Sequence, residues 1–123
     1  MREGEPRNFV QPCLLLLLDE RPDHGYELIE RLRLLCGVDN DASGIYRALR
    51  NLERAGLVCS SWTTATPGPA RRMYHLTANG AAVLAESAAA LTRTRASIDA
   101  FLHRYARRAE NSTRGAAVYR FQR

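Results

Sequence analysis

Apolar residues along the chain follow three different spacings, and each spacing predicts a type of element. Residues 9–18 are apolar on every side, which is typical of a buried helix. Residues 23–36 and 41–55 have apolar positions three and four apart, which predicts two amphipathic helices. The segments "LVCSSWTT" and "RRMYHL" flank the breaker-rich "ATPGPA", and this pattern predicts a β-hairpin.

The first predicted helix has no polar face between Leu14 and Leu18. A helix that is apolar all round must be covered all round. One small domain supplies limited cover, so we expect a partner surface here and assign Leu14 and Leu17 to a dimer contact.

The second helix is predicted to start at Asp23 as N-cap and to stop at Gly37. Its buried face is predicted to contain Gly25, Leu28, Ile29, Leu32, Leu35 and Cys36, and its outer face Glu27, Glu30, Arg31 and Arg33.

The third helix is predicted to be capped by Asp41 or Ser43 and to end at Gly56. Its inner stripe is Ile45, Ala48, Leu49 and Leu52. At about 100° per residue, a polar row lies on the opposite side, flanked by Tyr46. That row consists of Ser43, Arg47, Arg50 and Arg54.

After the hairpin, Thr77 is predicted to cap a long last helix with a coiled-coil seam. The seam positions are Ala81, Leu84, Ala88, Leu91, Ile98, Leu102 and Tyr105. Arg95 falls in the seam, where it either pairs with Glu86 or Asp99 of a second chain or marks an opening. We assign Leu84, Leu91, Ile98 and Leu102 to dimerisation, against the twin helix, the partner's first helix, or both.

Three helices followed by a two-stranded ribbon are typical of a winged helix-turn-helix. The predicted fold is therefore mainly α with a small β-hairpin and a long C-terminal dimerisation helix. We expect an N-terminal arm over residues 1–8, the winged domain over 9–77, the dimerisation helix over 78–109, and a mobile tail over 110–123.

The charge of the chain fits a nucleic-acid partner. The 123 residues carry a net charge of +5, and every basic residue other than histidine is an arginine. Guanidinium groups bind phosphate bidentately and read guanine. Arg71 and Arg72 are placed at the wing tip after Gly68, where we expect phosphate contacts. The alternative is a solvated hairpin tip, but a second basic row on the third helix favours DNA.

Other classes of function are poorly supported by the sequence. No apolar run approaches the roughly 20 residues of a membrane span, and the start does not resemble a signal peptide, so we expect a cytoplasmic protein. Cys13, Cys36 and Cys59 lie in apolar runs and are interpreted as inert buried thiols, with a redox or metal role as the weaker alternative. No catalytic constellation or cofactor motif is present, so an enzyme is not expected.

Three segments in this order resemble the PadR-like family of transcriptional regulators: "PDHGYELIERL", "GIYRALRNLERAGLV" and "GPARRMYHLTANG". The resemblance runs from about Pro12 to Gly80. The family's "HGY" matches His24 to Tyr26, its recognition-helix tyrosine matches Tyr46, and its "GPARR" matches Gly68 to Arg72. Asp41 to Gly44 replace the family's usual start of the third helix, so base preference does not carry over.

The resemblance implies a homodimeric repressor that binds double-stranded operator DNA and is released by a small-molecule effector. Phe101 and Tyr105 supply an aromatic wall, and Arg95 a charge, for an acidic, phenolic or other aromatic compound. The alternative for these three residues is plain dimer core without a ligand. The alternative function is a winged-helix module that binds protein and not DNA, although its basic recognition face argues against this.

Overall fold

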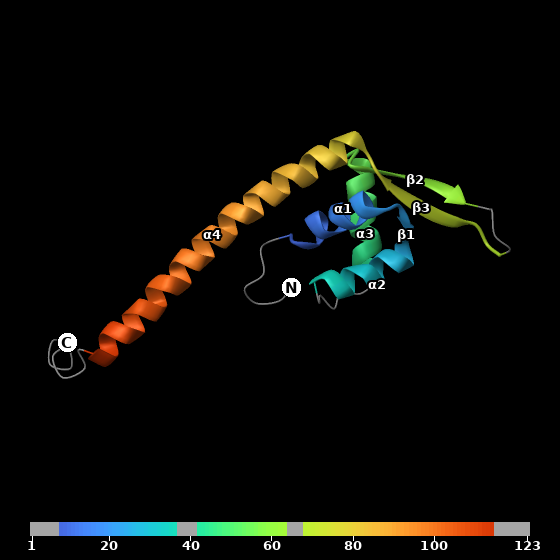
Figure 1. The fold of residues 1–123 in the computed structure, drawn as a ribbon. Coiled ribbons are helices and arrows are strands. Elements are labelled where there is room, and N and C mark those ends of the chain that lie inside the picture. Colours follow the sequence, from blue (N-terminus) through green and yellow to red (C-terminus); the bar gives the residue numbers. More distant parts are fainter. Residues whose placement is uncertain (1–7, 37–41, 64–67, 115–123) are drawn as a thin grey trace. The chain divides into compact units, whose positions relative to one another are not determined.

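The computed structural model describes residues 8–36, 42–63 and 68–114. Its elements are α1 (Val10–Glu20), β1 (Asp23–His24), α2 (Gly25–Cys36), α3 (Ala42–Arg54), β2 (Val58–Thr63), β3 (Arg71–Leu76) and α4 (Ala78–Arg114). Helices α1, α2 and α3 gather together, and the β2–β3 hairpin extends away from them (Figure 1). This arrangement confirms the predicted winged helix-turn-helix.

The sheet has one strand more than the sequence predicted. It is antiparallel with the order β1-β3-β2. Strand β1 places Asp23 opposite Tyr74 and His24 opposite Met73. The prediction that Asp23 caps α2 is therefore wrong, because this residue belongs to β1 and α2 begins two residues later.

Helix α1 lies in the core of the chain. Leu14 and Leu15 are fully buried, and Leu17 and Leu18 nearly so, while Leu16 is 37% exposed. The chain itself thus covers most of this apolar helix, by packing it against α2, α3 and β3. Because Leu14 and Leu17 have almost no surface to offer a second chain, their assignment to a dimer contact is corrected to core packing.

The guanidinium of Arg31, in α2, forms hydrogen bonds with residues of β1 and α1. It donates to the carboxylate of Asp23 (3.0 Å) and to the carbonyl of Leu17 at the end of α1 (2.8 Å). A third hydrogen bond reaches Glu20 at 3.2 Å. The side chain is only 13% exposed, so its predicted place on the outer face was wrong. A cation at a helix C-terminus also interacts favourably with the helix dipole.

The end of α3 fixes where the wing begins. The N–H of Gly56 donates to the carbonyl of Glu53, and that of Leu57 to the carbonyl of Leu52, both at 3.0 Å. This pair of bonds is a Schellman motif, and Gly56 has the positive φ of 78° that the motif requires. Gly56 therefore ends the helix, as the sequence predicted.

Thr77 caps α4 and joins it to the same turn. Its Oγ1 accepts the N–H of Gly80 (3.0 Å), and its hydroxyl donates to the carbonyl of Gly56 (2.7 Å). A Cβ on Gly80 would collide with the carbonyl of Leu57, so only glycine allows this close approach. The cap predicted at Thr77 is thus confirmed.

The far end of α2 departs from its predicted pattern. Leu28 and Leu32 are buried, but Leu35 is 45% exposed. The predicted stop at Gly37 and cap at Asp41 lie outside the described residues.

The three cysteines differ in burial. Cys13 is buried, Cys36 partly buried and Cys59 exposed, so the prediction of three core thiols is wrong for Cys59.

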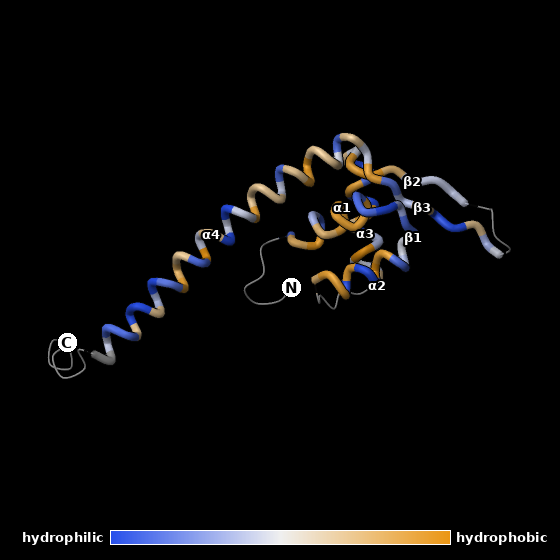
Figure 2. Tube along the Cα trace, viewed as in Figure 1, coloured by the Kyte–Doolittle hydropathy of each residue, from blue (hydrophilic) through white to orange (hydrophobic). Residues whose placement is uncertain are grey.

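The chain divides into two compact units within α4, after Ala88. The helix has 37 residues and continues to Arg114, beyond the Ala109 expected from its apolar spacing. Hydrophobic and hydrophilic bands alternate along it (Figure 2). Of the predicted seam residues, Leu84 is partly buried against the core and Leu91 is also partly buried, whereas Ile98 and Leu102 are 46% and 54% exposed, so only the later part of the seam is accessible.

Candidate nucleic-acid interface

The exposed face of α3 carries the predicted basic row. Ser43, Arg47, Arg50 and Arg54 are exposed, whereas Ile45, Leu49 and Leu52 on the opposite face are buried. Within the described part of the chain, none of these three arginines lies within ion-pair distance of a carboxylate. Their charge is therefore available to an external anion.

The carboxylate of Glu53, near the end of α3, is hydrogen-bonded to the wing. Glu53 accepts a hydrogen bond of 2.7 Å from the hydroxyl of Ser60 on β2. This contact joins α3 to the wing and turns the carboxylate away from the arginine row. The row thus keeps its positive potential.

The paired arginines of the wing have different surroundings. They are the first two residues of β3, opposite Thr63 and Trp62, and not part of the hairpin tip as predicted. The exposed Arg71 lies 5.8 Å from the ring centre of Tyr26, and Arg72 lies 5.0 Å over the ring of Trp62. Both distances are within the range of cation–π contacts. Residues 64–67, which contain the tip, lie outside the described residues.

A pocket of about 380 Å³ opens beside these arginines. It brings the start of α2, one residue of α3 and both wing strands to one place. Its lining consists of His24, Gly25, Tyr26, Tyr46, Trp62, Arg71, Arg72 and Tyr74. The Nε of Arg72 is buried there without a hydrogen-bond partner among the described atoms. Aromatic rings and guanidinium groups in one hollow favour an anionic ligand.

Sequence reasoning missed part of this pocket. His24, Tyr26 and Trp62 were not among the predicted site residues, yet all three line the pocket, and Trp62 is 62% exposed. The "HGY" motif was the available signal, because it brings a histidine and a tyrosine to the start of a helix that precedes the recognition helix.

Gly25 positions the tyrosine of α3. A Cβ on Gly25 would collide with the ring of Tyr46. The glycine therefore lets α3 pack closely on the start of α2 while the tyrosine lines the pocket. Tyr46 is partly buried against the core and also lines the pocket.

Gly68 leads back from the wing tip to β3. Its φ is +119°, and nothing lies within 4 Å of the position where a Cβ would be. Backbone conformation, and not space, is what requires glycine here.

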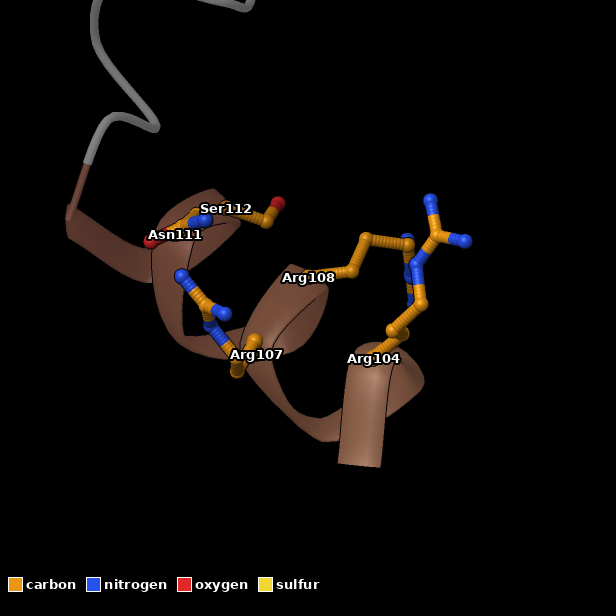
Figure 3. A pocket seen from close by; sticks show the side chains of 5 residues that line it. All are labelled: Arg104, Arg107, Arg108, Asn111 and Ser112. Atoms are coloured by element: carbon orange, nitrogen blue, oxygen red, sulfur yellow. The ribbon is translucent and has the colours of Figure 1, made fainter. Parts of the chain in front are cut away.

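The residues predicted to form an effector pocket lie on the second part of α4. Phe101 and Tyr105 line a hollow of about 660 Å³, but Arg95 is not among its lining residues. A neighbouring hollow of about 430 Å³ is lined by Arg104, Arg107, Arg108, Asn111 and Ser112, all from the same helix (Figure 3). Arg108 stacks 4.7 Å from the ring centre of Tyr105. One helix supplies every wall, so nothing here tests the predicted effector pocket, which needs a second chain.

The described residues form neither a metal-binding cluster nor a membrane-spanning helix. No group of three or more His, Cys, Asp or Glu side chains there is placed to hold a metal ion. None of the described helices combines the length and apolar character that a membrane span needs.

Fold and surface together define a winged helix-turn-helix protein with a basic face on α3. Residues 14–86, more than half of the chain, match the PadR-like family of transcriptional regulators, and the chain belongs to this family. Its members regulate transcription and are not enzymes. No curated protein matches the chain significantly.

Solved structures share the fold. A conserved protein of unknown function, described as a potential transcriptional factor, is 31% identical with a TM-score of 0.76, over 89% of this chain and 99% of that one. A PadR family transcription regulator from Clostridium difficile R20291 is 21% identical with a TM-score of 0.72, over 77% and 99%. PadR of Bacillus subtilis, solved with operator DNA, is 24% identical with a TM-score of 0.59, over 66% and 47%.

Proposed function

We propose that this chain binds specific duplex DNA through α3 and the wing. The observation that carries the proposal is the arginine row of α3, which is exposed and has no carboxylate partner among the described residues. Recognition helices of this kind enter the major groove with their N-terminal residues. Arg47 and Arg50 are then the base-reading residues, and Arg54 contacts phosphate. The related PadR of Bacillus subtilis was solved with operator DNA, which supports the proposal.

The pocket beside the wing is proposed to receive a backbone phosphate of the same DNA. Arg71 is exposed at its rim, and Tyr26, 55% exposed, offers a hydroxyl. Contacts of this kind fix the register of a protein on the duplex without reading sequence. Tyr46 sits between the base-reading row and this pocket, so both contacts use the same helix.

A homodimer is proposed as the DNA-binding form. Phe101 and Tyr105 are 67% and 55% exposed beside the seam residues Ile98 and Leu102. Apolar residues spaced three and four apart on a long helix are typical of a coiled-coil contact. Two reading heads would then bind half-sites about 34–36 Å apart.

Repression and release by an effector complete the proposal. A dimer bound across a promoter blocks transcription, and this activity belongs in the cytoplasm with the DNA. A small aromatic or phenolic compound that binds only an opened dimer would lower DNA affinity by its differential affinity for the two forms. Arg95, Phe101 and Tyr105 remain the proposed contacts, with a twin helix supplying the opposite wall.

Selection from a pool of random duplexes tests the central claim. We expect one enriched sequence with two-fold symmetry, bound by the parent protein and weakly by an Arg47→Ala/Arg50→Ala variant. Arg33→Ala is the matched control, because Arg33 is exposed on α2 and pairs with Glu30. Failure to enrich any sequence, or equal binding by the double variant, would refute the proposal. A reporter gene behind the selected site then distinguishes repression from activation, and a panel of phenolic acids tests release.

A further inference from the structure

Two of the three cysteines meet inside the winged domain. Cys13 is in α1 and 4% exposed, and Cys36 is the last residue of α2 and partly exposed. The thiol of Cys36 donates to the sulfur of Cys13 at a sulfur–sulfur distance of 2.8 Å.

The two sulfur atoms lie closer together than non-bonded sulfur atoms normally do, but not at covalent distance. Sulfur atoms in a disulfide are about 2.05 Å apart, so the two must approach by roughly 0.8 Å. Helices α1 and α2 already pack against each other here. A change of this size is within the reach of side-chain rotation, and the fold need not open.

We propose that Cys13 and Cys36 are a redox modification site that peroxide oxidises to an intramolecular disulfide. The Cys36 thiolate attacks one oxygen of hydrogen peroxide, which gives a sulfenic acid at Cys36 and hydroxide. The Cys13 sulfur then attacks the Cys36 sulfur, a sulfur–sulfur bond forms, and the hydroxyl leaves as water. In total, two thiols and one peroxide give one disulfide and two waters.

The order of attack follows from exposure. Cys36 is the more accessible sulfur and meets the oxidant first, while the buried Cys13 is placed to resolve the sulfenic acid before a second peroxide arrives. A thiol beside the first one is typical of cysteines that are oxidised reversibly.

The bond would join α1 to the helix that precedes α3. Cross-linking removes conformational freedom from the unfolded chain, so the oxidised protein gains stability. The closed loop contains β1 and nearly all of α2. These two elements supply His24, Gly25 and Tyr26 to the lining of the pocket beside the wing. Oxidation would thus tighten the part of the fold on which the recognition helix packs.

Cys59 provides the contrast that the test needs. It is exposed on β2, opposite His75, and not near another cysteine of the described chain. A Cys59→Ser protein keeps only the pair, and Cys13→Ser and Cys36→Ser in that background each leave a single thiol. Cys36→Ser is the milder change, because this residue is partly exposed.

The experiment treats folded Cys59→Ser protein with one equivalent of hydrogen peroxide. We expect loss of both thiols, a mass lower by two hydrogen atoms, one chain on a non-reducing gel, and recovery with dithiothreitol. A tryptic peptide pair should carry the Cys13–Cys36 link. The melting temperature should rise by about 5 °C or more in the oxidised form. The Cys36→Ser control should show neither the mass loss nor the rise.

Three results would overturn the proposal. Both thiols could survive one equivalent of peroxide, the mass could increase by whole oxygen atoms, or the chains could become cross-linked to one another. Each would mean that the two sulfurs do not react together in the folded protein. The measurements use no DNA, so they stand or fall separately from the proposed regulatory function.

Discussion

At the scale of single residues, Gly25 and Tyr46 depend on each other. The glycine leaves room for the ring, and the ring lines the wing pocket from α3. A methyl group at position 25 has to displace a partly buried aromatic side chain. The close packing of α3 on the start of α2 therefore depends on the missing side chain of Gly25 and on the ring of Tyr46.

We predict that Gly25→Ala destabilises the domain by about 1–3 kcal/mol, the usual cost of overpacking. Urea unfolding measures this free energy. Tyr46→Phe keeps the ring and should leave the cost of Gly25→Ala unchanged, whereas Tyr46→Ala removes the ring and should reduce it. Additive losses in the Gly25→Ala/Tyr46→Ala protein would show that the two side chains do not meet.

The pKa values of Asp23 and Glu27 are shifted in opposite directions. Burial acts to raise the pKa of Asp23, but hydrogen bonds from Glu27, the His24 N–H and Arg31 outweigh it and leave this pKa below its ordinary 3.8. The hydrogen bond to Asp23 and burial raise the pKa of Glu27 above its ordinary 4.5. Glu27 thus keeps its proton in the fold more readily than in the unfolded chain.

Because the two pKa values are shifted in opposite directions, Asp23 and Glu27 contribute to stability with opposite pH dependences. The contribution of Asp23 to stability is complete above pH 3.8 and is lost as the pH falls through its lowered pKa. The contribution of Glu27 is complete below pH 4.5 and is lost as the pH rises through its raised pKa. Glu27→Gln carries a permanent donor toward Asp23, so we predict that this loss on the alkaline side disappears.

Unfolding free energies measured between about pH 4 and about pH 7 provide the check. The stability of Glu27→Gln relative to the parent should increase across that range. Glu30→Gln, an exposed carboxylate change on the same helix, should show no such increase. A flat difference for Glu27→Gln would mean that the two carboxyl groups share no proton.

The positions of some single residues could be predicted from the sequence, and those of others could not. The α3 row could be predicted, because a helix converts sequence spacing directly into faces. Arg31 could not, since its burial depends on Asp23 and on the carbonyl of Leu17, which come from two other elements. Arg71 and Arg72 are neighbours in sequence, but the position of α2 gives Arg71 its contact with Tyr26, while the register of β2 places Trp62 against Arg72.

At the scale of elements, the wing combines a binding part and a structural part. Arg71 is exposed at the pocket rim, whereas Arg72 is partly buried over Trp62 and its backbone carbonyl lies 3.3 Å from Nδ1 of His24. We predict that Arg71→Ala lowers the slope of log affinity against log salt by about 0.9, the value for one phosphate contact. Titrations of the selected duplex over a range of salt measure it, and a parental slope would exclude the contact.

Trp62 reports on the same element, because it is the single tryptophan of the chain. It lines the pocket under Arg72, so we predict that DNA binding changes its fluorescence. Arg72→Ala should shift the emission of the free protein, while Arg33→Ala should leave it unchanged. Saturation with DNA without any change in emission would place the phosphate away from this pocket.

Among the elements, helices and the hairpin could be predicted and β1 could not. Apolar periodicity needs several residues, and β1 has two, Asp23 and His24. Its pairing with β3 is a contact between residues about fifty positions apart, which local sequence does not encode. The covering of α1 was missed for the same reason, because the residues that bury its leucines come from later elements.

At the scale of the whole molecule, the two units differ in how they bury apolar surface. The unit up to Ala88 contains the buried core, with Leu28 and Leu49 fully covered. In the unit from Ala89 onward the described residues form the rest of α4, where Leu91 is partly buried and four larger apolar side chains are about half exposed or more: Ile98, Phe101, Leu102 and Tyr105. Such a helix gains stability mainly from a partner that covers this surface. The dimer proposal therefore rests on the second unit alone, since α1 is covered within the chain.

We predict that Leu91→Asp and Ile98→Asp dissociate a homodimer, because each places a charge in the apolar seam. The winged domain should keep its fold, since neither residue belongs to its core, and circular dichroism of the remaining structure checks this. Sedimentation velocity should give a dimer for the parent and a monomer for the variants, with operator affinity falling at least tenfold. Arg93→Asp lies on the exposed surface of the same helix but outside the predicted seam, and although it changes the net charge by more than either seam variant, it should stay dimeric. A monomeric parent at micromolar concentration, or a dimer that survives both seam changes, would show that the partner is not a second copy bound along this helix.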